Sequence, residues 1–116
     1  MATRTARTLM VEGHPVALDP EGYLVSLDDW SERVAEALAA DEGRELTPAH
    51  WEIIGVLRDF YQRFEAAPAM RPLVKAVKQA LGEEKGNSIY LMRLFPDSPA
   101  KVGARLAGLP KPTNCL

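Results

Sequence analysis

The chain has 116 residues, of which 47% are hydrophobic and 26% charged, and its formal net charge is −2. This length and composition are typical of one globular domain with its own core. The slight negative charge excludes a strongly basic protein, so any polyanion-binding patch must be local. The sequence predicts neither a signal peptide nor a membrane span. With one cysteine and no secretion signal, we expect a cytoplasmic protein.

The N-terminal part of the chain predicts a small β-ribbon. Residues 1–8 are polar and aperiodic, and we expect them to form a disordered leader. Short apolar runs at 9–11 and 16–18 predict two strands, and a third run, at 23–25, follows the turn signal Asp19-Pro20-Glu21-Gly22. A hairpin or three-stranded ribbon of this size must pack against a larger body to be stable.

Two helices are predicted next, from capping residues and from apolar residues at three- and four-residue spacing. The first begins near Asp28-Asp29 and ends at Gly43. The second has Thr47 as its cap and Pro48 as its first residue, which is a strong start signal. Its apolar stripe is the longest in the chain, so we expect it to be the core helix, with its aromatic residues buried: Trp51, Phe60 and Phe64.

Three shorter helices complete the prediction. The third runs from near Pro72 to Gly82, and the fourth is capped by Asn87 or Ser88. The fifth starts at Ser98-Pro99 and is closed by Gly108.

These elements predict a mainly helical α+β fold, with a small N-terminal β-hairpin or ribbon packed on a five-helix orthogonal bundle. A single domain spans residues 9–108, and residues 109–116 form a mobile C-terminal arm that carries the only cysteine, Cys115. Pro110 and Pro112 favour an extended conformation in this arm. Fully extended, it reaches roughly 20 Å from Gly108 to Cys115.

The thiol of Cys115 is the candidate reactive group. An unperturbed cysteine has a pKa of about 8.5, and the neighbouring carboxylate of Leu116 opposes ionisation. Lys111 in the arm, and Lys101 and Arg105 at its root, are candidates to stabilise the thiolate. From these residues alone, Cys115 is either a delivered nucleophile or an incidental surface thiol.

A second candidate is a basic stripe on the third predicted helix, formed by Arg71, Lys75 and Lys78. It can dock an acidic partner, steer tRNA, or simply be a solvated helix face. The helices also permit a helix-turn-helix module that binds nucleic acid, although the acidic net charge argues against it. His14 and His50 do not cluster with Cys115, so no metal site is predicted. His50 suits capping or packing better than general-base catalysis.

The C-terminal residues Ala107-Gly108-Leu109-Pro110-Lys111-Pro112-Thr113-Asn114-Cys115-Leu116 resemble the signature of the TusE/DsrC/DsvC family of small sulfur-carrier proteins. Further segments resemble the family's hairpin, central helix and later helices: residues 21–24, 50–52, 58–61, 82–90, 93–96 and 99–101.

The resemblance implies a sulfurtransferase that needs no cofactor and carries sulfane sulfur as a persulfide on Cys115. Dissimilatory members have a second cysteine eleven positions earlier, where this chain has Ala104. The chain therefore looks like the TusE type, which passes sulfur from a TusBCD-like donor towards MnmA for 2-thiolation of tRNA. The alternative that the resemblance leaves open is a DsrC-like carrier or regulator that partners dissimilatory sulfite reductase.

Overall fold

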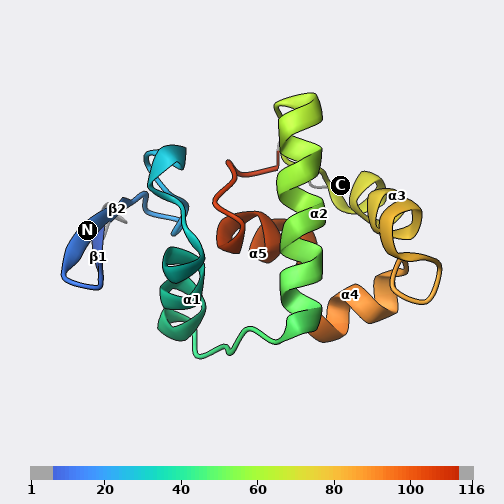
Figure 1. The fold of residues 1–116 in the computed structure, drawn as a ribbon, viewed down its shortest axis with the longest axis horizontal. Coiled ribbons are helices and arrows are strands. Elements are labelled where there is room, and N and C mark those ends of the chain that lie inside the picture. The colour runs from blue at the N-terminus through green and yellow to red at the C-terminus, as the bar shows by residue number, and fades with distance from the viewer. Residues whose placement is uncertain (1–6, 113–116) are drawn as a thin grey trace, which may run out of the picture.

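The computed structural model describes residues 7–112 of the chain. A two-stranded hairpin precedes five α-helices, which confirms the predicted mainly helical α+β fold. Figure 1 shows α2 through the middle of the molecule, with α1 and the hairpin on one side and α3 and α4 on the other. The elements are β1 (Arg7–Val11), β2 (His14–Leu18), the 3-10 turn η1 (Leu27–Asp29), α1 (Glu32–Asp41), α2 (Pro48–Phe64), α3 (Met70–Leu81), α4 (Ser88–Leu94) and α5 (Pro99–Leu106).

The hairpin is antiparallel and pairs Leu9 with Val16. Its two-residue turn has positive φ at both positions, 50° at Glu12 and 82° at Gly13, which matches the right-handed twist of the strands. Arg7 and Thr8 belong to β1, so the part of residues 1–8 that is described is a strand and not a disordered leader.

The third strand of the predicted ribbon is reduced to one bridge, between Leu18 and Leu24. The reason is local, because the side chain of Asp19 accepts hydrogen bonds from the backbone N–H groups of Glu21 and Tyr23, both at 2.9 Å. A side chain that binds these donors competes with a strand ladder. Tyr23 is buried, and its hydroxyl donates to the carbonyl of Lys101 in α5 at 3.3 Å.

Helix α1 begins at Glu32 and not at the predicted Asp28-Asp29. The aspartates lie in η1, and Trp30 after them is extended, with φ −68° and ψ 139°. The cap of α1 is Ser31, whose hydroxyl accepts from the N–H of Val34 at 3.2 Å. The interruption at Trp30 has a tertiary cause, since its indole binds the end of α5.

The remaining helix starts follow their capping residues, apart from α3. Helix α2 begins at Pro48, Asn87 caps α4, and Ser98 caps α5, as predicted. Helix α3 begins at Met70, two residues before the predicted Pro72.

Helix α5 lies at the centre of the core, although α2 has the longer apolar stripe. Six of the eight residues of α5 are buried, and the helix packs against α1, α2, α3 and α4. Its small residues permit this, because a Cβ atom at Gly103 would come within 2.9 Å of Leu57 Cδ1 of α2. The helix that continues into the arm is thus the most enclosed one.

The prediction that the aromatic residues of α2 are all in the core is wrong for Phe64. Its side chain is 61% exposed, and Phe60 is only partly buried. The last turns of α2 extend past the neighbouring helices (Figure 1), so the apolar stripe continues where there is no longer a helix to cover it.

Candidate functional site

Helix α5 leads directly into the arm that ends in Cys115 and Leu116, which lie outside the described residues. The described part of the site is therefore the base of the arm, from Arg105 to Pro112. Cys115 as the reactive residue stays a prediction.

The last turn of α5 ends in a Schellman motif. The N–H of Leu109 donates to the carbonyl of Ala104 at 2.9 Å, and the N–H of Gly108 donates to the carbonyl of Arg105 at 3.3 Å. Gly108 has a φ of +74°, which this motif requires and which glycine adopts without strain. The motif satisfies two of the carbonyl groups that a helix end leaves without an intrahelical partner.

The next two carbonyl groups are bound by two side chains, Trp30 and Arg58, which we call the clamp. The indole Nε1 of Trp30 donates to the carbonyl of Leu106 at 2.9 Å. Nη1 of Arg58, from α2, donates to the carbonyl of Ala107 at 2.7 Å. The guanidinium carbon of Arg58 lies 3.8 Å from the centre of the Trp30 ring, a cation–π contact. Burial of the guanidinium lowers the pKa of Arg58.

The clamp also explains why residue 108 is glycine. A Cβ atom there would lie 2.2 Å from Cδ1 of Trp30, which is closer than any real contact. The indole ring therefore packs on the bare backbone of Gly108. The end of α5 is held by its own turn, by the segment before α1 and by α2.

The structure corrects the predicted boundary of a mobile arm at Leu109. Leu109 is 2% exposed and Pro112 is buried, so the arm is packed against the domain as far as it is described. The ammonium group of Lys111 lies 2.8 Å from the carboxylate of Glu21, in the loop after β2. Cys115 comes three positions after Pro112, so its Cα atom can lie at most about 11 Å from that of Pro112, a shorter reach than the predicted 20 Å from Gly108.

Two of the three cations predicted to stabilise a thiolate are already paired. Lys111 binds Glu21, and the guanidinium of Arg105 binds both carboxylate oxygens of Glu42 at 2.7 and 2.8 Å. The Arg105–Glu42 pair is about four-fifths buried, so it joins α5 to the end of α1. Lys101 is exposed, and its ammonium group makes no ion pair within residues 7–112. Lys101 is therefore the one of the three whose charge no described carboxylate offsets.

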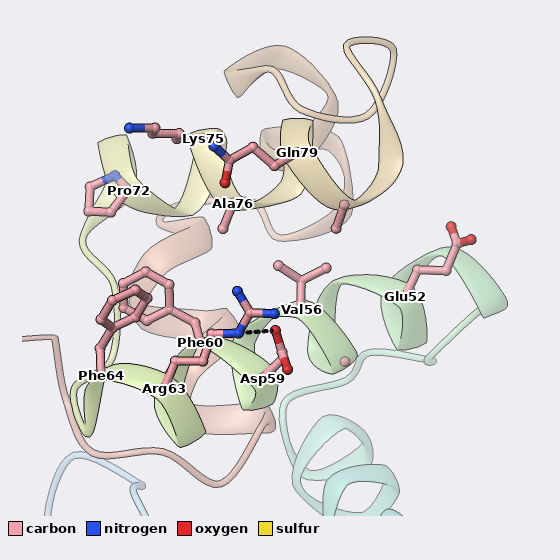
Figure 2. Close-up of a pocket in the computed structure, with 12 residues that line it drawn as sticks. Glu52, Val56, Asp59, Phe60, Arg63, Phe64, Pro72, Lys75, Ala76 and Gln79 are labelled. Atoms are coloured by element: carbon pink, nitrogen blue, oxygen red, sulfur yellow. Dashed lines mark ion pairs between the residues drawn. The ribbon is translucent and has the colours of Figure 1, made fainter.

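The basic stripe of α3 is also divided. Lys78 lies 3.6 Å from Glu83, whereas Arg71 and Lys75 have no ion pair within the described part of the chain. Lys75 lies at the rim of a groove between α2 and α3 (Figure 2). Of the three basic residues of the stripe, only Lys78 therefore has its charge offset by a described carboxylate.

His50 is a structural residue, as the sequence favoured. Its Nδ1 accepts from the backbone N–H of Thr47 at 3.1 Å, so Nε2 carries the proton and donates to the carbonyl of Leu94 at 2.8 Å. The ring also packs edge-on against Phe95. His14 is exposed, in β2 and not in a turn.

Within residues 7–112, no three histidine, cysteine or acidic side chains come together in a way that could hold a metal ion. No helix in the same range is long and apolar enough to cross a membrane.

Sequence reasoning missed the clamp, although a signal for Arg58 was present. Arg58 follows Leu57 and lies four residues after Ile54, so a charge interrupts the buried stripe of α2. Such a charge usually has a specific buried partner. The partners themselves are 49 and 76 residues away from the two side chains, beyond any local pattern.

Comparison with known proteins places this arrangement in a family. The family model described as DsrC like protein matches residues 10–116. Sulfurtransferase TusE of Salmonella typhimurium (strain LT2) is 52% identical over 108 residues, which is 93% of this chain and 99% of that protein. Sulfurtransferase TusE of Escherichia coli (strain K12) is 51% identical over the same shares.

Solved structures agree with these relatives. The NMR structure of Allochromatium vinosum DsrC has a TM-score of 0.88 and 52% identity, and covers 97% of this chain and 100% of that one. The crystal structure of the oxidized gamma-subunit of dissimilatory sulfite reductase (DsrC) from Archaeoglobus fulgidus has a TM-score of 0.82 and 43% identity, and covers 95% and 100%. The predicted family and the predicted sulfurtransferase function in a sulfur relay are confirmed. The chain belongs to the DsrC-like family of sulfur-relay proteins.

Proposed function

We propose that Cys115 is the sulfur-carrying residue of this sulfurtransferase, and that the chain relays sulfur for the 2-thiolation of tRNA. The donor is a TusBCD-like complex, and the acceptor is an MnmA-like enzyme that holds the tRNA. The observation that carries this proposal is the identity of 51–52% to proteins named sulfurtransferase TusE, over 93% of the chain. The family match runs to residue 116 and so includes the cysteine.

The proposed step is an exchange between thiols and needs no external oxidant. The Cys115 thiolate attacks the outer sulfur of a donor persulfide, R–S–SH. The donor S–S bond breaks as the Cys115 S–S bond forms, and the donor leaves as the thiolate R–S⁻. Cys115 then carries –S–SH, and an acceptor thiolate removes the outer sulfur in the same way. Neither step changes the total number of S–S bonds.

The packed base of the arm supports delivery into a partner over a short distance. Because Cys115 comes only three positions after Pro112, which limits the distance between their Cα atoms to about 11 Å, a partner has to bind beside the arm before sulfur can pass. Of the three cations predicted to stabilise the thiolate, Arg105 and Lys111 already have their positive charge offset by Glu42 and Glu21. Lys101 is therefore the strongest candidate to stabilise the thiolate.

Mass spectrometry tests the proposal. The chain is incubated with a persulfide donor and digested with trypsin, which releases residues 106–116 as one peptide because Lys111 precedes proline. We expect this peptide to gain one sulfur atom, and the gain to disappear after reduction and in Cys115→Ser. A chain that takes up no sulfur from the TusBCD complex or from sodium polysulfide would contradict the proposal.

A second candidate is a DsrC-like role with dissimilatory sulfite reductase as the partner. The 52% identity to Allochromatium vinosum DsrC is as high as that to the TusE proteins, which favours keeping it. Against it, the position eleven residues before Cys115 is Ala104, a fully buried alanine. Binding assays separate the two roles: the first predicts sulfur transfer to the tRNA-bound acceptor, and the second predicts a complex with the reductase.

A further inference from the structure

A groove of about 710 Å³ runs between α2 and α3. Figure 2 shows Phe60, Phe64 and Val56 on the α2 side and Pro72 and Ala76 on the α3 side, all facing the same hollow. Four charged side chains stand at its rim: Glu52, Asp59 and Arg63 on α2, and Lys75 on α3. The groove is therefore apolar inside and charged at its edges.

The apolar lining includes an aromatic side chain that the fold leaves mostly exposed to solvent. Phe64 is 61% exposed and lies against Phe60, with 4.6 Å between the ring centres. A pair of aromatic rings left at the mouth of an apolar groove is typical of a surface that a partner covers. Other exposed apolar side chains, such as Ile89 on α4, do not line this groove.

The walls of the groove favour a helix as the occupant. Both walls are α-helices, whose backbone N–H and C=O groups are used in their own hydrogen bonds. An extended peptide would find no strand edge to pair with, whereas a helix satisfies its own backbone. The lining residues span about 18 Å of α2 and about 12 Å of α3, which is the length of two to three helical turns.

The charged side chains at the rim indicate which charge the partner carries where it contacts the groove. Asp59 lies 3.3 Å from Arg63, and Glu52 accepts a hydrogen bond from Lys85 that raises the pKa of that lysine. Both α2 carboxylates at the rim are thus compensated. Lys75 is the rim charge without an ion pair among residues 7–112, and Arg71 lies one turn before it on the same helix. The excess charge at the groove is positive.

The groove is also close to the arm. In Figures 1 and 2 the described end of the arm passes beside the C-terminal part of α2, the part that carries Phe64. A helix held in the groove would therefore lie next to the described end of the arm, three positions before Cys115 in the sequence.

We propose that the α2–α3 groove is a docking site for an acidic amphipathic helix of a protein partner in the sulfur relay. Apolar side chains of that helix fill the groove against Phe60 and Phe64, and its carboxylates face Lys75 and Arg71. The inference rests on the proposed relay function. In this proposal the groove binds the partner protein, because the arm is too short to do so by itself.

The test measures sulfur transfer from the persulfide-loaded TusBCD complex to the full chain, and from the loaded chain to the tRNA-bound acceptor MnmA. Two variants alter the groove, Phe64→Ala and Lys75→Glu. Two matched controls make the same changes on α4, Ile89→Ala at a side chain that is 67% exposed and Arg93→Glu at an exposed cation. Loading of Cys115 by sodium polysulfide, which needs no protein partner, is measured for every variant.

We expect each groove variant to raise KM for one of the two partners by about tenfold, with kcat and polysulfide loading unchanged. The controls should stay within about twofold of the wild type in both assays. Unchanged KM values for both partners, with normal polysulfide loading, would overturn the docking site and leave the relay function intact. Failure of the wild-type chain to load with polysulfide would instead contradict the relay function.

Two further measurements test for other occupants of the groove, a second copy of the chain and the chain's own last residues. A dimer in sedimentation that Phe64→Ala abolishes would show a second copy in the groove and overturn the proposal. NMR shifts of Phe64 and Ala76 that change when the chain is ended at Pro112 would show the chain's own last residues there, with the same consequence. We expect a monomer and unchanged shifts.

Discussion

Replacing Arg58 by methionine tests whether the clamp holds the base of the arm. Methionine keeps much of the side-chain volume but removes the hydrogen bond to the carbonyl of Ala107 and the contact with Trp30. A hydrogen bond from a charged donor contributes about 1.5–3 kcal/mol, and a cation–π contact about 0.5–2 kcal/mol. The cost of burying the guanidinium, which also lowers its pKa, offsets part of this gain.

We therefore expect Arg58→Met to lower the free energy of unfolding by about 2–3 kcal/mol, which lowers Tm by roughly 8–12 °C in a domain of this size. Denaturant unfolding followed by circular dichroism gives the first quantity. Hydrogen exchange at the amide of Leu109, which closes the Schellman motif, reports on the arm base itself. Its protection should fall more than that of amides in the middle of α2.

The matched control is Arg63→Met, one and a half turns along the same helix. Arg63 is 70% exposed on its side chain and pairs with Asp59 at 3.3 Å, so its loss should cost at most about 0.5 kcal/mol. The reasoning would be refuted if Arg58→Met were as stable as this control, or if the Leu109 amide kept its protection.

Three further outcomes are expected. Gly108→Ala should destabilise the fold by about 2 kcal/mol or more in denaturant unfolding, because the site needs positive φ and has no room for a Cβ atom. Ser31→Ala should cost about 1 kcal/mol through the lost cap of α1, while Ser26→Ala, whose hydroxyl makes no cap hydrogen bond, should cost much less. A hydrogen bond from Arg7 lowers the pKa of Asp41, so its stabilisation is present above about pH 4 and is lost as the pH falls through the folded-state pKa. Acid titration of Asp41→Asn should show a smaller loss of stability over that range than the wild type, and equal losses would contradict the assignment.

The elements that the sequence predicted well are those with local causes. Thr47-Pro48, Asn87 and Ser98-Pro99 start helices through their own side chains and ring, and Gly108 ends α5 because it adopts positive φ. These signals act within four residues, which is the range that a sequence pattern can report.

The elements that were predicted wrongly depend on distant parts of the chain. Asp28 and Asp29 look like caps, but Trp30 is drawn into an extended conformation by the end of α5, and Ser31 takes the role of cap. Phe64 continues the apolar stripe of α2, but the pattern cannot report that the covering helices stop short of it.

The candidate site divides in the same way. Cys115, which stays a prediction, and its proline-rich spacer were selected as the candidate site from the residues and from the resemblance to a family. The ion pairs of Arg105 and Lys111 could not, because their carboxylates lie 63 and 90 residues away in the sequence. Burial of Leu109 and Pro112 likewise follows from packing and not from the local sequence, which favours an extended, free arm.

The buried position of α5 has a consequence for how the arm can change. In many proteins a C-terminal segment can be lengthened, exchanged or fused without effect on the fold, because it leaves from the surface. Here the segment leaves from the middle of the core, and every carbonyl group of its last helical turn is already bound. Substitutions inside the domain, at Gly103 or Leu57 for example, therefore shift the origin of the arm together with the core. The position of the arm up to Pro112 is therefore set by the packing of the core, so we expect the core and the residues that follow Pro112 to change together in evolution.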